Sequence, residues 1–331
     1  MLEKLAENIY VKQVPLPDNP LRYINVYIIT GERNLVIDTG FNRPECEAAF
    51  QEAFDELGIS SADLFITHLH SDHCGLAWKF DNDDSVVYAS ETDGELINFE
   101  TGSYYWKILD DLFISYGFPP ADFGRNTDIH PGRQYALDRR INFKYVNDGD
   151  VLEYGGYKLT CIHTPGHTPG HMCLYDRENR RLFSGDHILG LITPNITIEI
   201  GADNPLDDYR KSLERIRNLE VEHMMTTHGL PVPDMRGRVD ELMEHHRNRL
   251  AEVVKILGNE WKTAYKTAAD MTWEIDCRNW DEFPGPQKWF ATGEAISHLQ
   301  YLRGIGIAER KEIDGVWHYR CIENPVTPLH F

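Results

Sequence analysis

Apolar and polar positions along the first part of the chain predict strands and helices in alternation. Two apolar, β-branched runs at residues 23–30 and 35–38 flank a short polar stretch, which predicts a hairpin. Apolar residues then recur at helical spacing over residues 44–57, and Gly58 follows where a left-handed cap residue belongs. A short buried strand is predicted at residues 64–67, and it leads directly into a histidine.

An aromatic-rich stretch interrupts this alternation between about residues 95 and 130. Its apolar side chains fall at three- and four-residue steps with polar residues on the other side, which predicts an amphipathic helical insertion. The alternation then resumes, with strands predicted at 141–146, 156–164, 172–175 and 181–184, a helix at about 205–219 and a short strand ending at His228. These elements predict one α/β domain over residues 1–233.

The pattern changes after the Pro-Val-Pro sequence at residues 231–233. Helical spacing of apolar residues predicts a helix over about 239–257, closed by Gly258, and another over 290–303. Apolar runs at 307–313 and 316–321 flank an Asp-Gly turn and predict a terminal hairpin. Helices followed by a hairpin are typical of a winged helix, so residues 234–331 are expected to form a small winged-helix-like domain.

The charge balance argues against a nucleic-acid partner. The 331 residues allow two domains and, with 41% of them hydrophobic, can bury a sizeable core, but their formal net charge of −20 repels phosphate backbones. From Met235 onward, 13 basic and 15 acidic residues nearly balance, so nucleic acid could bind only there. The candidate recognition segment at 289–303 lacks the basic stripe that a groove-reading helix needs, and nucleic-acid binding is therefore not expected.

Membrane insertion and export are not expected either. No stretch has the eighteen or so apolar residues that a membrane span needs, and residues 1–14 contain no apolar signal core. The six cysteines show no CxxC spacing, which is typical of reduced thiols. We therefore expect a cytoplasmic protein.

Candidate chemistry is concentrated in the histidines, of which the chain has 15. The sequence His68-Leu-His70-Ser-Asp72-His73 places four potential metal ligands in six residues. Residues two apart in an extended segment point the same way, so His68 and His70 can share one cation. Three further potential ligands follow predicted strands, namely His167, Asp186 and His228. Five histidines and two aspartates suffice for two metals with one shared carboxylate and an open solvent position.

These residues resemble the metallo-β-lactamase superfamily, specifically its dinuclear hydrolases of the glyoxalase II type. The motifs HxHxDH, TPGHTPGH, SGDH and THG occur in the family's order after an LVIDTG strand, and the resemblance covers about residues 10–233. It implies an αββα sandwich of two mixed sheets with helices outside. It also implies two metal sites that share Asp186, one held by His68, His70 and His167 and the other by Asp72, His73 and His228.

Three other polar residues are expected to support these ligands. His163 and His171 flank His167 and are predicted to orient ligands or to brace the loop, while Asp38 is a candidate acceptor for a ligand histidine. His187, beside Asp186, has no role assigned from the sequence.

Two cations beside one water lower its pKa, so a metal-bridging hydroxide can attack a carbonyl or phosphorus centre. Asp72 is the predicted catalytic residue, because it can orient this nucleophile and pass its proton to the leaving group. Zinc is the first expectation for the two divalent ions, and iron or manganese would use the same ligands. The insertion helix, with Tyr105, Leu109 and Phe113, is predicted to line a pocket for a small molecule with an apolar portion; the alternative is that it packs on the domain or in a homodimer interface.

The expected reaction is hydrolysis of a thioester, ester or lactone, with two alternatives. The tail differs from the thiol-substrate region of glyoxalase II, so a glutathione thioester is disfavoured. Phosphodiester or RNA hydrolysis is one alternative, since superfamily ribonucleases can carry a winged helix. The other is an iron-dependent, persulfide dioxygenase-like reaction. Such proteins keep HxHxDH, whereas flavodiiron proteins carry Glu where this chain has His70.

Overall fold

The computed structural model of the chain describes residues 2–126, 131–322 and 331, and places most strands in two sheets. The first sheet has seven strands in the order β1 to β7: β1 (Leu2–Ala6), β2 (Ile9–Pro15), β3 (Tyr23–Ile29), β4 (Leu35–Ile37), β5 (Asp63–Phe65), β6 (Val87–Ser90) and β7 (Phe143–Val146). Strands β1 to β4 pair antiparallel, and β4 to β7 pair parallel, so the sheet is mixed.

The second sheet has five strands in the order β12-β11-β10-β9-β8. They are β8 (Val151–Tyr154), β9 (Tyr157–His163), β10 (Met172–Asp176), β11 (Arg181–Gly185) and β12 (His223–Thr226). Only the β11–β12 pair is parallel. Apolar side chains from both sheets form a shared core between them, including Ile29, Ile37, Phe65, Leu174 and Phe183.

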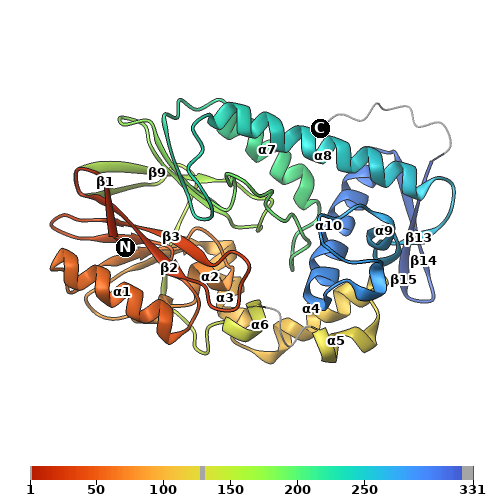
Figure 1. Ribbon diagram of the computed structural model, residues 1–331, viewed down its shortest axis with the longest axis horizontal. Helices are drawn as coiled ribbons and strands as arrows, with labels where there is room; N and C mark the ends of the chain where they lie inside the picture. The colour runs from red at the N-terminus through yellow and green to blue at the C-terminus, as the bar shows by residue number, and fades with distance from the viewer. Residues whose placement is uncertain (1, 127–130, 323–330) are drawn as a thin grey trace.

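Helices cover the outer faces of both sheets (Figure 1). Helix α1 (Pro44–Leu57) packs its buried face, with Phe50 and Ala53, on the outside of the first sheet, and Gly58 ends it at φ 65°. The short helices α2 (Ser71–Cys74) and η1 (Ala77–Lys79) follow β5. Helices α7 (Pro205–Arg217) and α8 (Met235–Leu257) cover the second sheet. The predicted αββα sandwich is confirmed.

The insertion between β6 and β7 is helical. It contains α3 (Glu91–Glu100), α4 (Ser103–Ser115), α5 (Pro120–Asn126) and α6 (Pro131–Tyr135). The predicted amphipathic spacing agrees with α4, whose buried residues include Leu109 and Phe113. This insertion lies beneath the C-terminal elements rather than standing apart from the fold (Figure 1).

The C-terminal elements after α8 form three helical segments and a small sheet. These are β13 (Lys262–Thr263), α9 (Ala264–Asp270), η2 (Trp280–Glu282), α10 (Gly285–Gly304), β14 (Ala308–Ile313) and β15 (Val316–Cys321). The sheet is antiparallel in the order β13-β15-β14, and the terminal hairpin lies where the sequence predicts it. The comparison with a winged helix stays a prediction.

One apolar core joins this C-terminal part to the sandwich. It includes Ile162 and Tyr175 of the second sheet, Tyr209 of α7, and Leu299 of α10. The ring of Phe113 in α4 stacks on Trp289 of α10, with centroids 4.3 Å apart. The predicted boundary at residue 233 therefore does not separate two independent cores. In the described part of the chain, no helix combines the length and apolar character needed to cross a bilayer.

Candidate metal centre

The candidate ligands lie in loops at strand ends. Of the four ligands that follow β5, His68 and His70 lie in the loop before the short helix α2, and Asp72 and His73 lie within α2. The other three follow β9, β11 and β12, in the order His167, Asp186 and His228. Because β5 belongs to the first sheet and the other strands to the second, the loops of both sheets meet at one edge of the sandwich. The structure brings together all seven residues that the sequence motifs indicate as metal ligands.

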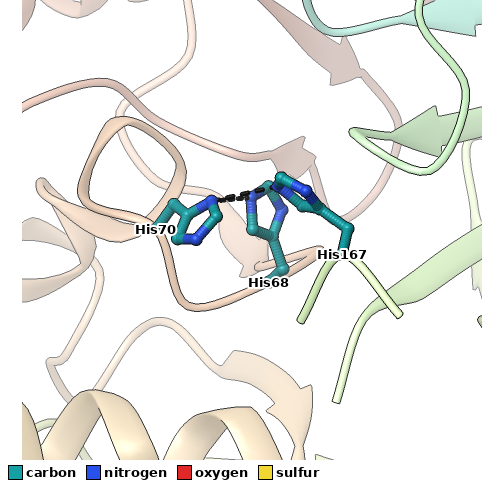
Figure 2. A group of neighbouring side chains, drawn as sticks. All are labelled: His68, His70 and His167. Carbon is teal, nitrogen blue, oxygen red and sulfur yellow. Dashed lines mark hydrogen bonds between the residues drawn. The ribbon is translucent and has the colours of Figure 1, made fainter. Parts of the chain in front are cut away.

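The first group consists of His68, His70 and His167, whose rings point toward one another (Figure 2). Nδ1 of His70 lies 3.1 Å from Nε2 of His68 and 3.0 Å from Nε2 of His167. Burial lowers the pKa of His70 to about 3, helped by His167, and it also lowers the pKa of His68 and His167. The imidazoles are therefore neutral at pH 7, and three ring nitrogens converge on a small volume.

The second group consists of Asp72, His73 and His228. Oδ2 of Asp72 lies 3.3 Å from Nε2 of His228 and 3.8 Å from Nε2 of His73. Both of these Nε2 atoms are buried, and neither makes a hydrogen bond to the described residues. Burial alone would lower the pKa of His73, but the carboxylates of Asp186, Asp38 and Asp72 raise it to about 10.

Asp186 lies between the two groups. Its Oδ1 is 3.4 Å from Nε2 of His73 and 3.6 Å from Nε2 of His228, while its Oδ2 is 3.8 Å from Nε2 of His167. One carboxylate oxygen thus faces each side. This is the placement that a carboxylate shared by two cations requires.

The donor set fits divalent metal ions. In each group, and in a third one formed by His68, His73 and Asp186, the possible ligand atoms lie within 4.8 Å of one another. Imidazole nitrogens and carboxylate oxygens without thiolates suit zinc, manganese or iron. Buried lone pairs that face each other and orphaned Nε2 atoms are costly without a cation, so the residues present fit two metals.

Asp38 and His171 contact candidate ligands on the side away from the metal centre, as the sequence pattern predicts. The carboxylate of Asp38 lies 2.9 Å from Nδ1 of His73 and accepts the backbone N–H of Thr67 at 2.8 Å. Nε2 of His171 accepts the backbone N–H of Asp186 at 3.2 Å. The Nδ1 of the same ring lies 2.8 Å from the hydroxyl of Thr164. Both residues therefore fix the backbone or the ring of a candidate ligand.

His163 and His187 stay outside the ligand groups. Nε2 of His163 lies 3.0 Å from the carbonyl of Pro169, so this half-buried ring braces the turn that carries His167. His187 is fully buried, and its ring packs against Tyr209 with centroids 5.2 Å apart. Burial lowers its pKa to about 3, which is consistent with a neutral packing role.

Several partners of the ligands were not predicted from the sequence. Nδ1 of His167 lies 2.8 Å from the carbonyl of Asn195, and Nδ1 of His228 lies 3.2 Å from the carbonyl of Tyr23. Donation to these carbonyls leaves each Nε2 lone pair directed at the centre. The hydroxyl of Thr227 donates to Oδ1 of Asp186. Thr227 belongs to the motif THG, so its contact with Asp186 could have been predicted from the sequence. The contacts with backbone carbonyls could not, because any residue can provide a carbonyl.

The predicted substrate pocket is wrong. Tyr105, Leu109 and Phe113 are at most 2% exposed and belong to the core beneath the C-terminal part. The hydroxyl of Tyr105 donates to Glu199 at 3.0 Å, and Phe113 stacks on Trp289. The helical spacing correctly predicts a buried face. This face packs on the rest of the fold, which is the alternative given above for the insertion helix.

Comparisons with known proteins agree with this geometry. The family model of the metallo-beta-lactamase superfamily matches residues 19–228, which include every candidate ligand. The chain is 24% identical over 282 residues to YqjP of Bacillus subtilis, described as a probable metallo-hydrolase, with 80% of this chain and 85% of that protein covered. It is also 24% identical to an atrochrysone carboxyl ACP thioesterase of Claviceps purpurea, covering 78% of this chain and 68% of the relative.

Among solved structures, a metallo-beta-lactamase family protein of Thermus thermophilus superimposes with a TM-score of 0.80 at 27% identity. The match covers 96% of this chain and 100% of that protein, so it extends beyond the sandwich to the C-terminal part. With the fold, the His/Asp groups and the family match in agreement, this chain belongs to the metallo-beta-lactamase superfamily and is a metal-dependent hydrolase.

Proposed function

We propose that the chain hydrolyses a thioester, ester or lactone at a dinuclear metal centre. The observation that carries this proposal is the carboxylate of Asp186, which has one oxygen facing each of two groups of ligands. His68, His70 and His167 would hold one ion, and Asp72, His73 and His228 the other. When bound, two such ions supply an acidified water and polarise the carbonyl under attack. Zinc is the ion that we propose, because imidazole nitrogens and carboxylate oxygens are its usual donors in catalytic sites; iron and manganese would use the same donors.

Asp72 is the residue that we assign to proton handling. Burial would raise the pKa of Asp72, but His73 and His228 hold it below its usual value, so the carboxylate is ionised at pH 7. Its side chain keeps 15% exposure, against 10% or less for Asp186, His73 and His228, so it is the charged group most open to a substrate. An ionised carboxylate here can orient the attacking water and transfer its proton to the leaving group.

Exposed apolar side chains in the loops that follow two candidate ligands favour a substrate with an apolar portion. Leu191 and Ile192, five and six residues after Asp186, are 75% and 42% exposed, and Leu230, two residues after His228, is 59% exposed. A methyl group at Gly190 would lie 2.4 Å from the carbonyl of Leu230, so the two loops pack side by side. An acyl chain or ring fits this apolar edge better than a bare phosphate does. The thioesterase from Claviceps purpurea is a relative with such a substrate in its name.

The burial of helix α10 in the C-terminal part favours a small-molecule substrate over nucleic acid. In α10, residues 288–289, 291–293 and 295–302 are buried, so the helix packs into the core on nearly all sides. A helix that reads a DNA groove must instead expose one face to the bases. We propose that this part of the chain stabilises the catalytic loops.

Metal analysis followed by a substrate panel tests the proposal. Purified protein should contain two metal ions per chain and hydrolyse thioesters, esters or lactones in preference to bis-phosphates. Asp186→Ala should abolish both metal occupancy and hydrolysis, because both groups lose the carboxylate between them. The control is Asp176→Ala, which removes a buried carboxylate whose partners are Asn179 and Arg181 and should leave both properties intact.

Three outcomes would contradict the proposal. Full activity with one ion or none would rule out the dinuclear centre. A preference for bis-phosphates would favour the phosphodiesterase alternative. Thiol-dependent oxygen consumption by an iron-loaded protein would replace hydrolysis by the dioxygenase-like reaction.

A further inference from the structure

A fully buried carboxylate outside the ligand groups contacts two of the loops that carry candidate ligands. Asp93 is the third residue of α3 and is 1% exposed. Its backbone N–H is already satisfied by the hydroxyl of Ser90, the N-cap of the helix, at 3.1 Å. The side chain of Ser90 thus caps the helix, and the carboxylate of Asp93 is available for contacts with other parts of the fold.

Three donors converge on this carboxylate. Oδ2 accepts the backbone N–H of Leu69 at 3.0 Å and the hydroxyl of Thr168 at 2.6 Å. Oδ1 accepts the backbone N–H of Gly170 at 2.6 Å. Leu69 lies between His68 and His70, while Thr168 directly follows His167. A single side chain thus ties the loop after β5, in the first sheet, to the loop after β9, in the second.

The loop after β9 approaches α3 closely at Gly170. A methyl group at Gly170 would lie 2.3 Å from the hydroxyl of Ser90 and 2.5 Å from Oδ1 of Asp93. The glycine therefore allows the backbone to reach the carboxylate. Across the same junction, Nε2 of His167 lies 3.0 Å from Nδ1 of His70, so a small shift between the loops changes the spacing of the ligand atoms directly.

We propose that Asp93 is a positioning residue that sets the spacing of His167 relative to His68 and His70. This inference rests on the proposed function, because it assumes that these three histidines hold a metal ion. Asp93 acts through the backbone of the loops, and it is not itself a ligand. Loss of its carboxylate should weaken the first metal site and leave the site of Asp72, His73 and His228 nearly unchanged.

Asp93→Asn is the sharpest test. The amide keeps the shape of the side chain but has one acceptor oxygen and one NH2 group. If the NH2 group replaces Oδ1, it faces the N–H of Gly170; if it replaces Oδ2, it faces the N–H of Leu69. In either orientation, one loop loses its acceptor. Removing such an outer partner of a metal site costs about 10- to 100-fold in metal affinity in other proteins, and we expect at least roughly a tenfold loss at one of the two sites.

The readout is metal binding by the full-length protein, not activity alone. Metal-free wild type and variants are titrated with Co²⁺ against a competing chelator, and the visible absorption of bound Co²⁺ reports the geometry of each site. In Asp93→Asn, one of two binding steps should weaken and its spectrum should change. Thr168→Val, which removes only one donor, should give a smaller change at the same step. It also keeps the test decisive if Asp93→Asn fails to fold.

Asn98→Ala provides the matched control. Asn98 lies on the same helix, is 7% exposed, and makes two hydrogen bonds to the backbone of Ile141, away from the ligands. This variant should lose thermal stability while keeping both Co²⁺ binding steps and their spectra. If Asp93→Asn and Thr168→Val bind Co²⁺ as Asn98→Ala does, the inference is overturned. If wild type itself binds no metal, the proposed function fails instead.

Discussion

At the scale of single residues, the centre is an unusual concentration of buried charge. His73 contacts or faces three carboxylates, those of Asp38, Asp72 and Asp186, and its pKa is raised to about 10 as a result. A single proton on one imidazole offsets only part of three negative charges in a buried site. Two divalent ions carry four positive charges, and one of them would displace this proton from His73. Carboxylates that destabilise the metal-free fold would therefore stabilise the metal-loaded one.

Another buried carboxylate, that of Glu199, gives a prediction about pH. Burial raises its pKa from 4.5 to about 7, while the unfolded chain keeps the ordinary value. Between these two values the folded state holds a proton that the unfolded state has lost, so the free energy of unfolding falls as pH rises and then levels off above pH 7. A pKa difference of this size corresponds to about 3 kcal/mol.

Glu199→Gln should remove this loss, because glutamine does not ionise and its amide oxygen can still accept the hydroxyl of Tyr105. Denaturant unfolding at pH 5 and pH 8 measures the difference. We expect the variant to be close to wild type at pH 5 and more stable by up to about 3 kcal/mol at pH 8. Equal pH dependence in the two proteins would show that Glu199 ionises normally in the folded state.

At the scale of elements, helix α10 contacts the loop that supports His167. A methyl group at Gly293 would overlap the hydroxyl oxygen of Thr197 and lie 2.9 Å from its Cβ, so Gly293→Ala must displace this side chain and strain the loop that carries it. Asn195, two residues before Thr197, provides the carbonyl 2.8 Å from Nδ1 of His167. We expect the variant to lose about 1–3 kcal/mol of stability, as is common for overpacked cores. It should also bind one metal ion more weakly, as measured by unfolding and by metal titration.

Gly304→Ala is the control for this substitution. Gly304 ends the same helix, and a methyl group there would meet only the side-chain amide of Asn204 at 3.0 Å. Alanine also has the higher helix propensity, so this variant should be neutral or slightly stabilised. Metal affinity that falls equally in both variants would contradict a specific effect of α10 on His167.

The same region shows what sequence periodicity can and cannot predict. The spacing of Leu109 and Phe113 correctly predicts a helix with a buried face, because a 3.6-residue period reflects burial on one side. It does not say what covers that face, and the core residue Trp289 lies 176 positions after Phe113 in the chain. Strand β1 was not predicted from the sequence, because its central residues are exposed and show no alternation of apolar and polar positions.

At the scale of the whole molecule, the seven candidate ligands could be predicted because their signals are local, and the family resemblance that their motifs carry implied the sandwich. Each ligand lies in a short motif that follows a strand, and strands that end at one edge deliver their loops to one place. The role of Asp93 could not be predicted, because it depends on donors at Leu69 and Gly170 that come from different sheets. The continuity of the core past residue 233 was missed because residues 231–233 suggest a linker.

That continuity predicts how the whole chain unfolds. The core that includes Ile162, Tyr209 and Leu299 joins the second sheet to the C-terminal part, so we expect the two to lose their packing together. Calorimetry of the metal-loaded protein should show one transition. Chelation should lower Tm, because metal ions bind the folded state in preference to the unfolded one. The transition should nevertheless remain single. Two transitions, one of them insensitive to the chelator, would mean that residues 234–331 fold as the separate domain that the sequence pattern suggests.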